Sequence, residues 1–135
     1  DDKYPGVPDF NLNLISEAPI NLGNLEIIPI PLVHLKLPVL GYRIGNLSYI
    51  TDTNFIPKES WELLKGTEIL IINALRKEKH ISHFNLKEAL EVIEIIKPQK
   101  AYLTHVSHLM GKHKEVSRVL PENVSFAYDG LKIEL

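Results

Sequence analysis

Hydrophobic and polar positions repeat along this chain with two different periods, one typical of strands and one of helices. Strand-like apolar runs occupy residues 25–30, 41–44, 47–50, 68–72 and 100–104. The run at 68–72 is nearly continuous, which is typical of a strand covered on both faces. The runs at 41–44 and 47–50 are separated by Gly45-Asn46, which favours a tight hairpin turn. Two last runs, at 124–128 and 131–135, predict a second hairpin around Asp129-Gly130.

Helical spacing of apolar residues follows three of these runs. The clearest case is residues 86–96, where the apolar positions recur at Leu86, Leu90 and Ile93, after Asn85 as a good N-cap with Glu88 three residues later. A proline at position 98 ends this helix. Shorter helices are predicted at 57–65 and 112–120. Residues 1–22 have no clean period and predict a loop or an extended arm.

Strands that alternate with helices, with hairpins at both ends, predict an α/β domain in which a mixed sheet carries its helices on one face. We expect an extended arm over residues 1–24 and one domain over residues 25–135. A chain of 135 residues with 44% hydrophobic residues suffices for one packed core. The face of the sheet without helices must also be buried, so we expect the chain to form homo-oligomers if no other segment covers that face.

Composition narrows the classes of function. The formal net charge is −2, and no long basic stretch occurs, so long nucleic acid is not the expected main partner. The chain has no cysteine, which excludes disulfides and thiolate chemistry. No apolar run approaches the ~18 residues of a membrane span. We therefore expect a cytoplasmic protein without membrane contact. Because the chain begins with Asp1 and its one methionine is Met110, we expect it to be a processed or truncated piece.

Three side chains that could bind metal follow strand-like runs: His34, Asp52 and His105. Side chains at strand ends converge on one crevice in layered α/β domains. Imidazoles offer one directional nitrogen, whereas a carboxylate has two oxygens and can bridge two divalent ions. The alternative for Asp52 is that it caps the following helix, and the alternative for each histidine is an ordinary surface position. Taken together, the three predict part of a metal site.

Further polar residues near these positions could contact a substrate. His83 lies with His80 in the loop before the long helix, where it could act as a general acid or bind phosphate. The alternative is a solvated polar loop. Lys36 is a candidate phosphate contact or an ordinary surface lysine. His108 could line the same crevice or support a metal ligand. The glycine-rich phosphate loops and the Gly-x-Ser-x-Gly elbow of serine hydrolases are absent from the sequence.

Several short motifs, in this order and spacing, are similar to those of one enzyme family. They are His34-Leu35-Lys36-Leu37 with Gly41-Tyr42, Tyr49-Ile50-Thr51-Asp52, His83-Phe84-Asn85-Leu86, Leu103-Thr104-His105-Val106-Ser107-His108 and Tyr128-Asp129-Gly130-Leu131. Across about 110 residues the chain resembles the C-terminal half of metallo-β-lactamase-fold hydrolases, closest to the branch of PhnP-like cyclic phosphodiesterases.

The resemblance implies an αββα sandwich that holds two divalent ions, zinc or manganese, between its sheets. It implies metal ligation by His34, Asp52 and His105, with Asp52 as the bridge, and attack on phosphorus by a metal-bound hydroxide. It implies that His83 contacts the substrate or assists the leaving group. The family's His-x-His-x-Asp-His motif is absent, so we expect this chain alone to bind metal weakly and to be inactive. At Asn73 relatives often carry an aspartate.

The predicted function of the full-length parent is therefore metal-dependent hydrolysis, with a small linear or cyclic phosphate ester as substrate. Two alternatives stay open. One is an endonuclease like the transfer-RNA-processing RNase Z, which shares the fold. The other is a non-catalytic structural or assembly module.

Overall fold

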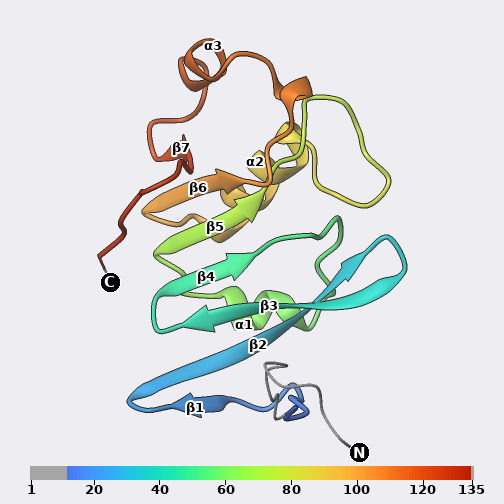
Figure 1. The fold of residues 1–135 in the computed structure, drawn as a ribbon, viewed down its shortest axis with the longest axis vertical. Helices are drawn as coiled ribbons and strands as arrows, with labels where there is room; N and C mark the ends of the chain where they lie inside the picture. Colours follow the sequence, from blue (N-terminus) through green and yellow to red (C-terminus); the bar gives the residue numbers. More distant parts are fainter. Residues whose placement is uncertain (1–11, 135) are drawn as a thin grey trace, which may run out of the picture.

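The computed structural model describes residues 12–134, in which seven strands lie side by side in their order along the chain (Figure 1). The strands are β1 (Ile20–Leu22), β2 (Leu25–His34), β3 (Leu37–Ile44), β4 (Leu47–Ile50), β5 (Ile69–Asn73), β6 (Lys100–Thr104) and β7 (Val124–Phe126). Pairing is antiparallel from β1 to β4 and parallel from β4 to β7. The predicted mixed α/β sheet is confirmed.

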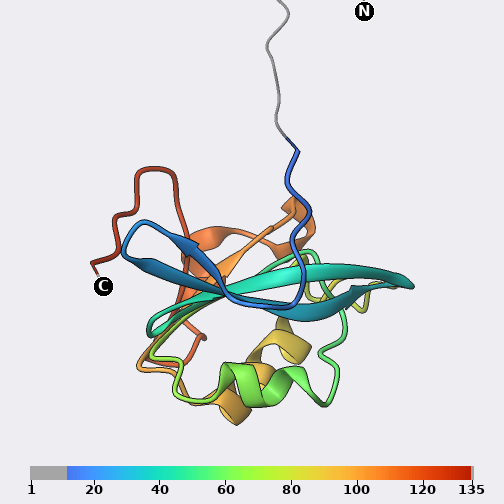
Figure 2. The same ribbon diagram turned by 90° about the horizontal axis from the view of Figure 1, so that it is seen from below.

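Helices connect the parallel strands. They are α1 (Ser60–Leu64), α2 (Leu86–Ile96), the 3-10 helix η1 (His108–Met110) and α3 (His113–Ser117). Figure 2 shows α1 and α2 beneath the same face of the sheet, as the sequence predicted. In the described part of the chain, the helices are too short or too polar to cross a membrane.

The predicted start of α2 is confirmed in its hydrogen bonds. The side-chain oxygen of Asn85 accepts from the Glu88 backbone N–H at 2.8 Å, and the Glu88 carboxylate accepts from the Asn85 N–H at 3.0 Å. This reciprocal pair satisfies two N–H groups that would otherwise lack partners at the first turn. The helix ends at Lys97, which adopts a left-handed conformation with φ 56° just before Pro98.

The core lies between the sheet and the helices. Ile30, Ile50, Ile72 and Leu103 come from four strands and are fully buried, and Ala89 of α2 packs in the same cluster. Burying an aliphatic side chain of this size contributes roughly 1.5–3 kcal/mol. The strands that carry the candidate site therefore belong to the best-packed part of the molecule.

The opposite face of the sheet is also apolar, but it is less covered. A hollow on this face is lined by Ile15, Ile20, Ile27, Tyr42, Ile44, Leu47 and Tyr49. Tyr49 is 39% exposed although it stands in a central strand. An apolar sheet face of this kind favours contact with a further layer.

Strand β2 is longer than the predicted run at 25–30, and His34 is its last residue rather than a residue beyond it. The two prolines at positions 29 and 31 are tolerated because β1 pairs only with Leu25–Ile27. In antiparallel pairing, alternate residues direct their N–H groups to opposite sides. Val33, on the same side as the prolines, bonds to the segment at Phe55 and Asn54 and not to β3. The prolines therefore cost no hydrogen bond to β3.

Other boundaries also differ. Residues 20–22, predicted as part of a loop, form β1, because Gly23 with φ 61° allows a tight turn back from β2. The predicted helices at 57–65 and 112–120 are shorter, at Ser60–Leu64 and His113–Ser117. The arm residues 1–11 lie outside the described residues.

The predicted C-terminal hairpin is wrong. Strand β7 pairs in parallel with β6, and residues 127–134 form no strand in the described structure. Asp129-Gly130 does make a turn, in which Leu131 N donates to Tyr128 O at 3.0 Å. Residues 131–134 keep the alternation of a strand but have no partner. Alternation alone therefore could not distinguish a paired strand from an unpaired one.

Candidate metal centre

Four strands end at the same edge of the sheet. β2 and β4 are both antiparallel to β3, and β5 and β6 are parallel to β4, so all four run in one direction (Figure 1). His34 is the last residue of β2, Asp52 follows β4 by two residues, and His105 directly follows β6. The structure thus places the three predicted metal ligands at one edge.

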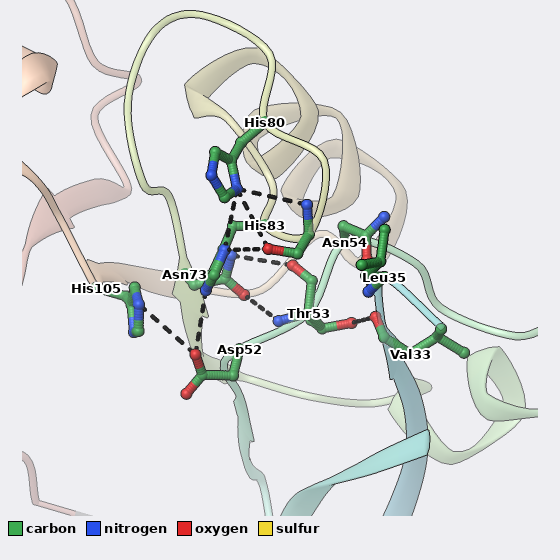
Figure 3. Close-up of polar contacts among 10 residues, drawn as sticks. Val33, Leu35, Asp52, Thr53, Asn54, Asn73, His80, His83 and His105 are labelled. Carbon is green, nitrogen blue, oxygen red and sulfur yellow. Dashed lines mark hydrogen bonds and ion pairs between the residues drawn. The ribbon is translucent and has the colours of Figure 1, made fainter. Parts of the chain in front are cut away.

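Histidine side chains converge on the carboxylate of Asp52, and Figure 3 shows those of His83 and His105. The Oδ1 atom of Asp52 lies 3.2 Å from His83 Nε2 and 3.6 Å from His105 Nε2. The His83 ring is 4.7 Å from the ring of His34 and 4.7 Å from that of His105. His83, which the sequence suggested as a substrate contact, lies between the two other histidines.

The backbone is in a rare conformation at two of these positions. Asp52 has φ 51° and His105 has φ 58°, both in the left-handed region. A non-glycine residue there costs roughly 1–2 kcal/mol, and such residues cluster at functional sites. Each turns the chain sharply just after a parallel strand. The surrounding hydrogen bonds must hold both turns in place.

Thr53 is the centre of the hydrogen bonds beside the turn at Asp52 (Figure 3). The fully buried Asn73 at the end of β5 accepts from Thr53 N at 3.2 Å and donates to Thr53 O at 3.0 Å. The Thr53 hydroxyl donates to Val33 O at 2.8 Å, next to His34. Phe84 N also donates to Thr53 O, at 2.9 Å. One buried threonine therefore ties together the chain segments that carry His34, Asp52 and His83.

A second contact fixes the turn after His34. Asn54 Oδ1 accepts from Leu35 N at 2.7 Å. Leu35 has φ 60°, which closes the two-residue turn between β2 and β3. The positioning roles of Thr53 and Asn54 were not predicted from the sequence. The available signal was their place directly after Asp52.

Residues of its own loop contact the His83 ring on the side away from Asp52. Its Nδ1 lies 2.9 Å from Ser82 Oγ and 3.1 Å from His80 Nδ1. Its side chain is only 12% exposed. Burial is the main cause that lowers the pKa of His83, with the charges of His105, His34 and His80 acting in the same direction and the hydrogen bond to Asp52 opposing them. A lowered pKa favours the neutral imidazole, the form that binds metal.

The donor set fits a divalent metal ion. One ligand atom each from His34, Asp52 and His83 lies within 4.8 Å of the others. Imidazole nitrogen and carboxylate oxygen are ligands that zinc and manganese both accept. These residues form one converging group among the residues described, which suits one ion. A pair of ions needs more ligands than this group provides.

The remaining predicted site residues lie nearby in sequence but outside the cluster. Lys36 is exposed at the tip of the β2–β3 hairpin, and His108 is the exposed first residue of η1. Within residues 12–134, no hydrogen bond or ion pair joins either of them to the cluster. Their predicted contact with substrate stays a prediction.

Comparison with known proteins agrees with this architecture. The family model described as "Beta-lactamase superfamily domain" matches residues 3–106. A crystal structure of a diphosphatase from the PhnP family is similar, with a TM-score of 0.87 and 37% identity over 90% of this chain and 47% of that one. Human tRNase Z, short form, has a TM-score of 0.65 at 16% identity over 85% of this chain and 45% of that one, a likeness of fold alone.

A curated relative carries a different name. The octanoyltransferase of Porphyromonas gingivalis (strain ATCC BAA-308 / W83) is 35% identical over 133 residues, which are 97% of this chain and 27% of that protein. The chain thus spans about a quarter of that relative and about half of the PhnP-family diphosphatase.

Proposed function

The chain belongs to the beta-lactamase superfamily, and on that premise we propose that it supplies half of the centre of a metal-dependent hydrolase. The observation that carries the proposal is the convergence of two imidazoles and a carboxylate, from His34, Asp52 and His105, at one sheet edge. We further propose that the whole protein cleaves a small phosphodiester, linear or cyclic. The likeness to a diphosphatase of the PhnP family supports a substrate of phosphate-ester type.

The proposed roles follow from position. His34, Asp52 and His105 would hold the ions, with the carboxylate of Asp52 placed to bridge a pair. Bound divalent ions supply Lewis acidity and lower the pKa of coordinated water. His83 faces the same carboxylate from the loop between β5 and α2, so in the whole protein it would donate a hydrogen bond to the leaving oxygen. Lys36 and His108 would contact the substrate from the exposed rim.

Two ions need further ligands, and the apolar sheet face needs a further layer. We propose that an upstream half of the protein supplies both. The chain spans about half of the PhnP-family structure, which supports this. The hollow around Tyr42 and Tyr49 would then lie between two sheets. Without that half, this face favours self-association, which light scattering of the chain measures; a monomer at high concentration would contradict it.

The alternatives carry less support. An RNase Z-like endonuclease shares the fold, but a net charge of −2 gives this chain little attraction for a polyanion. The name of the octanoyltransferase describes a protein of which this chain matches about a quarter. A non-catalytic module would not require the buried hydrogen bonds between Asn73 and Thr53 beside Asp52, which is held in a left-handed conformation.

The experiment is a phosphodiesterase assay of the full-length protein with added zinc or manganese. Linear and cyclic phosphodiesters are compared with a transfer-RNA precursor and an octanoyl thioester. We expect turnover of a small phosphodiester that a chelator abolishes. The Asp52→Asn variant should lose it, whereas His113→Gln on α3 should not. Turnover of the thioester or RNA alone would refute the phosphodiesterase proposal, and metal-independent turnover would refute the metal centre.

A further inference from the structure

We propose that His83 is a metal ligand in this chain, where one divalent ion, zinc for preference, is held by four of its own side chains: His34, Asp52, His83 and His105. This inference rests on the metal centre of the proposed function and adds a ligand to it. It also differs from the expectation of weak binding, which counted only three ligands.

Two of the distances around Asp52 are close to those expected in a tetrahedral coordination shell. With metal–ligand bonds of roughly 2.0–2.1 Å, neighbouring ligand atoms in a tetrahedron lie about 3.3 Å apart. Asp52 Oδ1 lies 3.2 Å from His83 Nε2 and 3.6 Å from His105 Nε2. Both separations lie close to that value. One ligand atom of His34 lies within 4.8 Å of those of Asp52 and His83. An ion held by all four residues would therefore require the side chains to close around it.

The orientation of the His83 ring points to the same role. A histidine that ligates through one ring nitrogen usually donates its other N–H to a neighbouring acceptor. The Nδ1 of His83 has two such neighbours, Ser82 Oγ at 2.9 Å and His80 Nδ1 at 3.1 Å. If Nδ1 carries the proton, the lone pair of Nε2 is directed at Asp52. A metal ion between them would satisfy both groups.

The other tautomer of His83 suits the role of donating a hydrogen bond to the leaving oxygen. With the proton on Nε2, His83 donates to Asp52, and the hydroxyl of Ser82 donates to Nδ1. The two roles therefore differ in which nitrogen carries hydrogen, and that is measurable. We expect the Nδ1–H tautomer when zinc is bound to the chain. In the whole protein, upstream ligands could replace His83 and release it toward the substrate.

The first experiment measures the affinity of the 135-residue chain for zinc by competition with a fluorescent chelator. We expect one ion per chain. Loss of an outer-shell partner of a metal ligand costs about 10–100-fold in affinity, so Ser82→Ala should weaken binding within that range. His83→Gln removes the ligand itself and should weaken binding by more than about 100-fold. The control His113→Gln changes a histidine that packs on Phe126, far from Asp52 in sequence, and should bind as the unchanged chain does.

The second experiment does not depend on a variant. Two-bond ¹H–¹⁵N spectra of the imidazoles report the tautomer of each histidine with and without zinc. We expect zinc to shift Nε2 of His83 while its Nδ1 keeps the proton. Circular dichroism verifies that each variant is folded.

The outcomes separate this inference from the proposed function. If His83→Gln binds zinc as tightly as the unchanged chain, or if zinc leaves the His83 signals in place, the inference is overturned and the proposed function is unaffected. If the chain binds no zinc at all, the inference is also overturned. If full-length protein shows no metal-dependent turnover while the chain binds zinc through His83, the proposed function fails and the inference stands.

Discussion

Replacing Asn73 with aspartate tests whether a buried amide holds the candidate centre in place. Asn73 is fully buried, and its amide bonds to both the N–H and the C=O of Thr53, at 3.2 and 3.0 Å. The Asn73→Asp variant keeps the shape and can still accept from the N–H. It cannot donate to the C=O while it is ionised, so a buried carboxylate oxygen would face a carbonyl oxygen.

The expected cost is at least about 2 kcal/mol at pH 7. A lost hydrogen bond contributes about 1 kcal/mol, and leaving a buried polar group unsatisfied costs about 1–3 kcal/mol, more when it is charged. Burial should raise the pKa of the new carboxyl group above the ~3.9 of an exposed aspartate. The loss of stability is then largest above this raised pKa. The loss becomes smaller as the pH falls through the raised pKa, because the protonated carboxyl group can donate again.

Urea unfolding at pH 7 and at pH 5 measures both effects. The matched control is Asn123→Asp, at a half-buried asparagine whose amide donates once, to Pro98 O at 3.0 Å. We expect a loss of about 1 kcal/mol for the control. The reasoning is refuted if Asn73→Asp destabilises no more than the control at pH 7, or if its deficit is equal at both pH values.

Three further predictions use the same unfolding assay. Gly41→Ala should cost about 1–3 kcal/mol, because the added Cβ would lie 2.8 Å from Ile50 Cγ2 and 2.9 Å from the backbone oxygen of Tyr49; a loss below about 0.5 kcal/mol would contradict that packing. Asn85→Ala should cost about 1 kcal/mol through loss of the cap on α2, and Asn85→Ser should recover most of it; equal losses would refute the capping role. The pKa of His83 is lowered in the folded protein, so the unfolded chain binds a proton at this residue more readily than the folded one. The free energy of unfolding should therefore fall as the pH drops below about 6.5. The His83→Gln variant should show a flatter pH profile, and an unchanged slope would contradict the assignment.

Elements with strong local signals were predictable from the sequence. The start of α2 at Leu86 follows from its cap, and β6 has the predicted bounds, Lys100–Thr104. Both depend on residues within a few positions of one another. The length of β2 was not predictable in this way, because tolerance of Pro29 and Pro31 depends on how far a distant strand pairs with it. Residues 131–134 are a second case, because they alternate like a strand but pair with no strand in the described structure.

The same difference between local and long-range signals applies to the candidate site. That His34, Asp52 and His105 meet could be predicted, because strand direction alone brings their positions to one sheet edge. Their left-handed turns could not, since a positive φ is uncommon for any residue other than glycine, even for aspartate and histidine. The position of His83 in the middle of the cluster was also missed. It depends on Phe84 donating to Thr53 O, a contact across 31 residues.

The network around Thr53 explains how this chain can hold ligands ready without a metal ion. The left-handed conformation of Asp52, the residue before Thr53, costs roughly 1–2 kcal/mol. Two hydrogen bonds join Asn73 to Thr53 and one joins Thr53 to Val33, and at about 1 kcal/mol each they offset a cost of that size. All three are made among residues that are buried or part-buried, where water competes little for them. The metal ion therefore need not provide the energy for the turn at Asp52, and its binding energy can appear as affinity. On this argument, weakening the network at Asn73 should lower zinc affinity as well as stability, even though Asn73 itself offers no ligand.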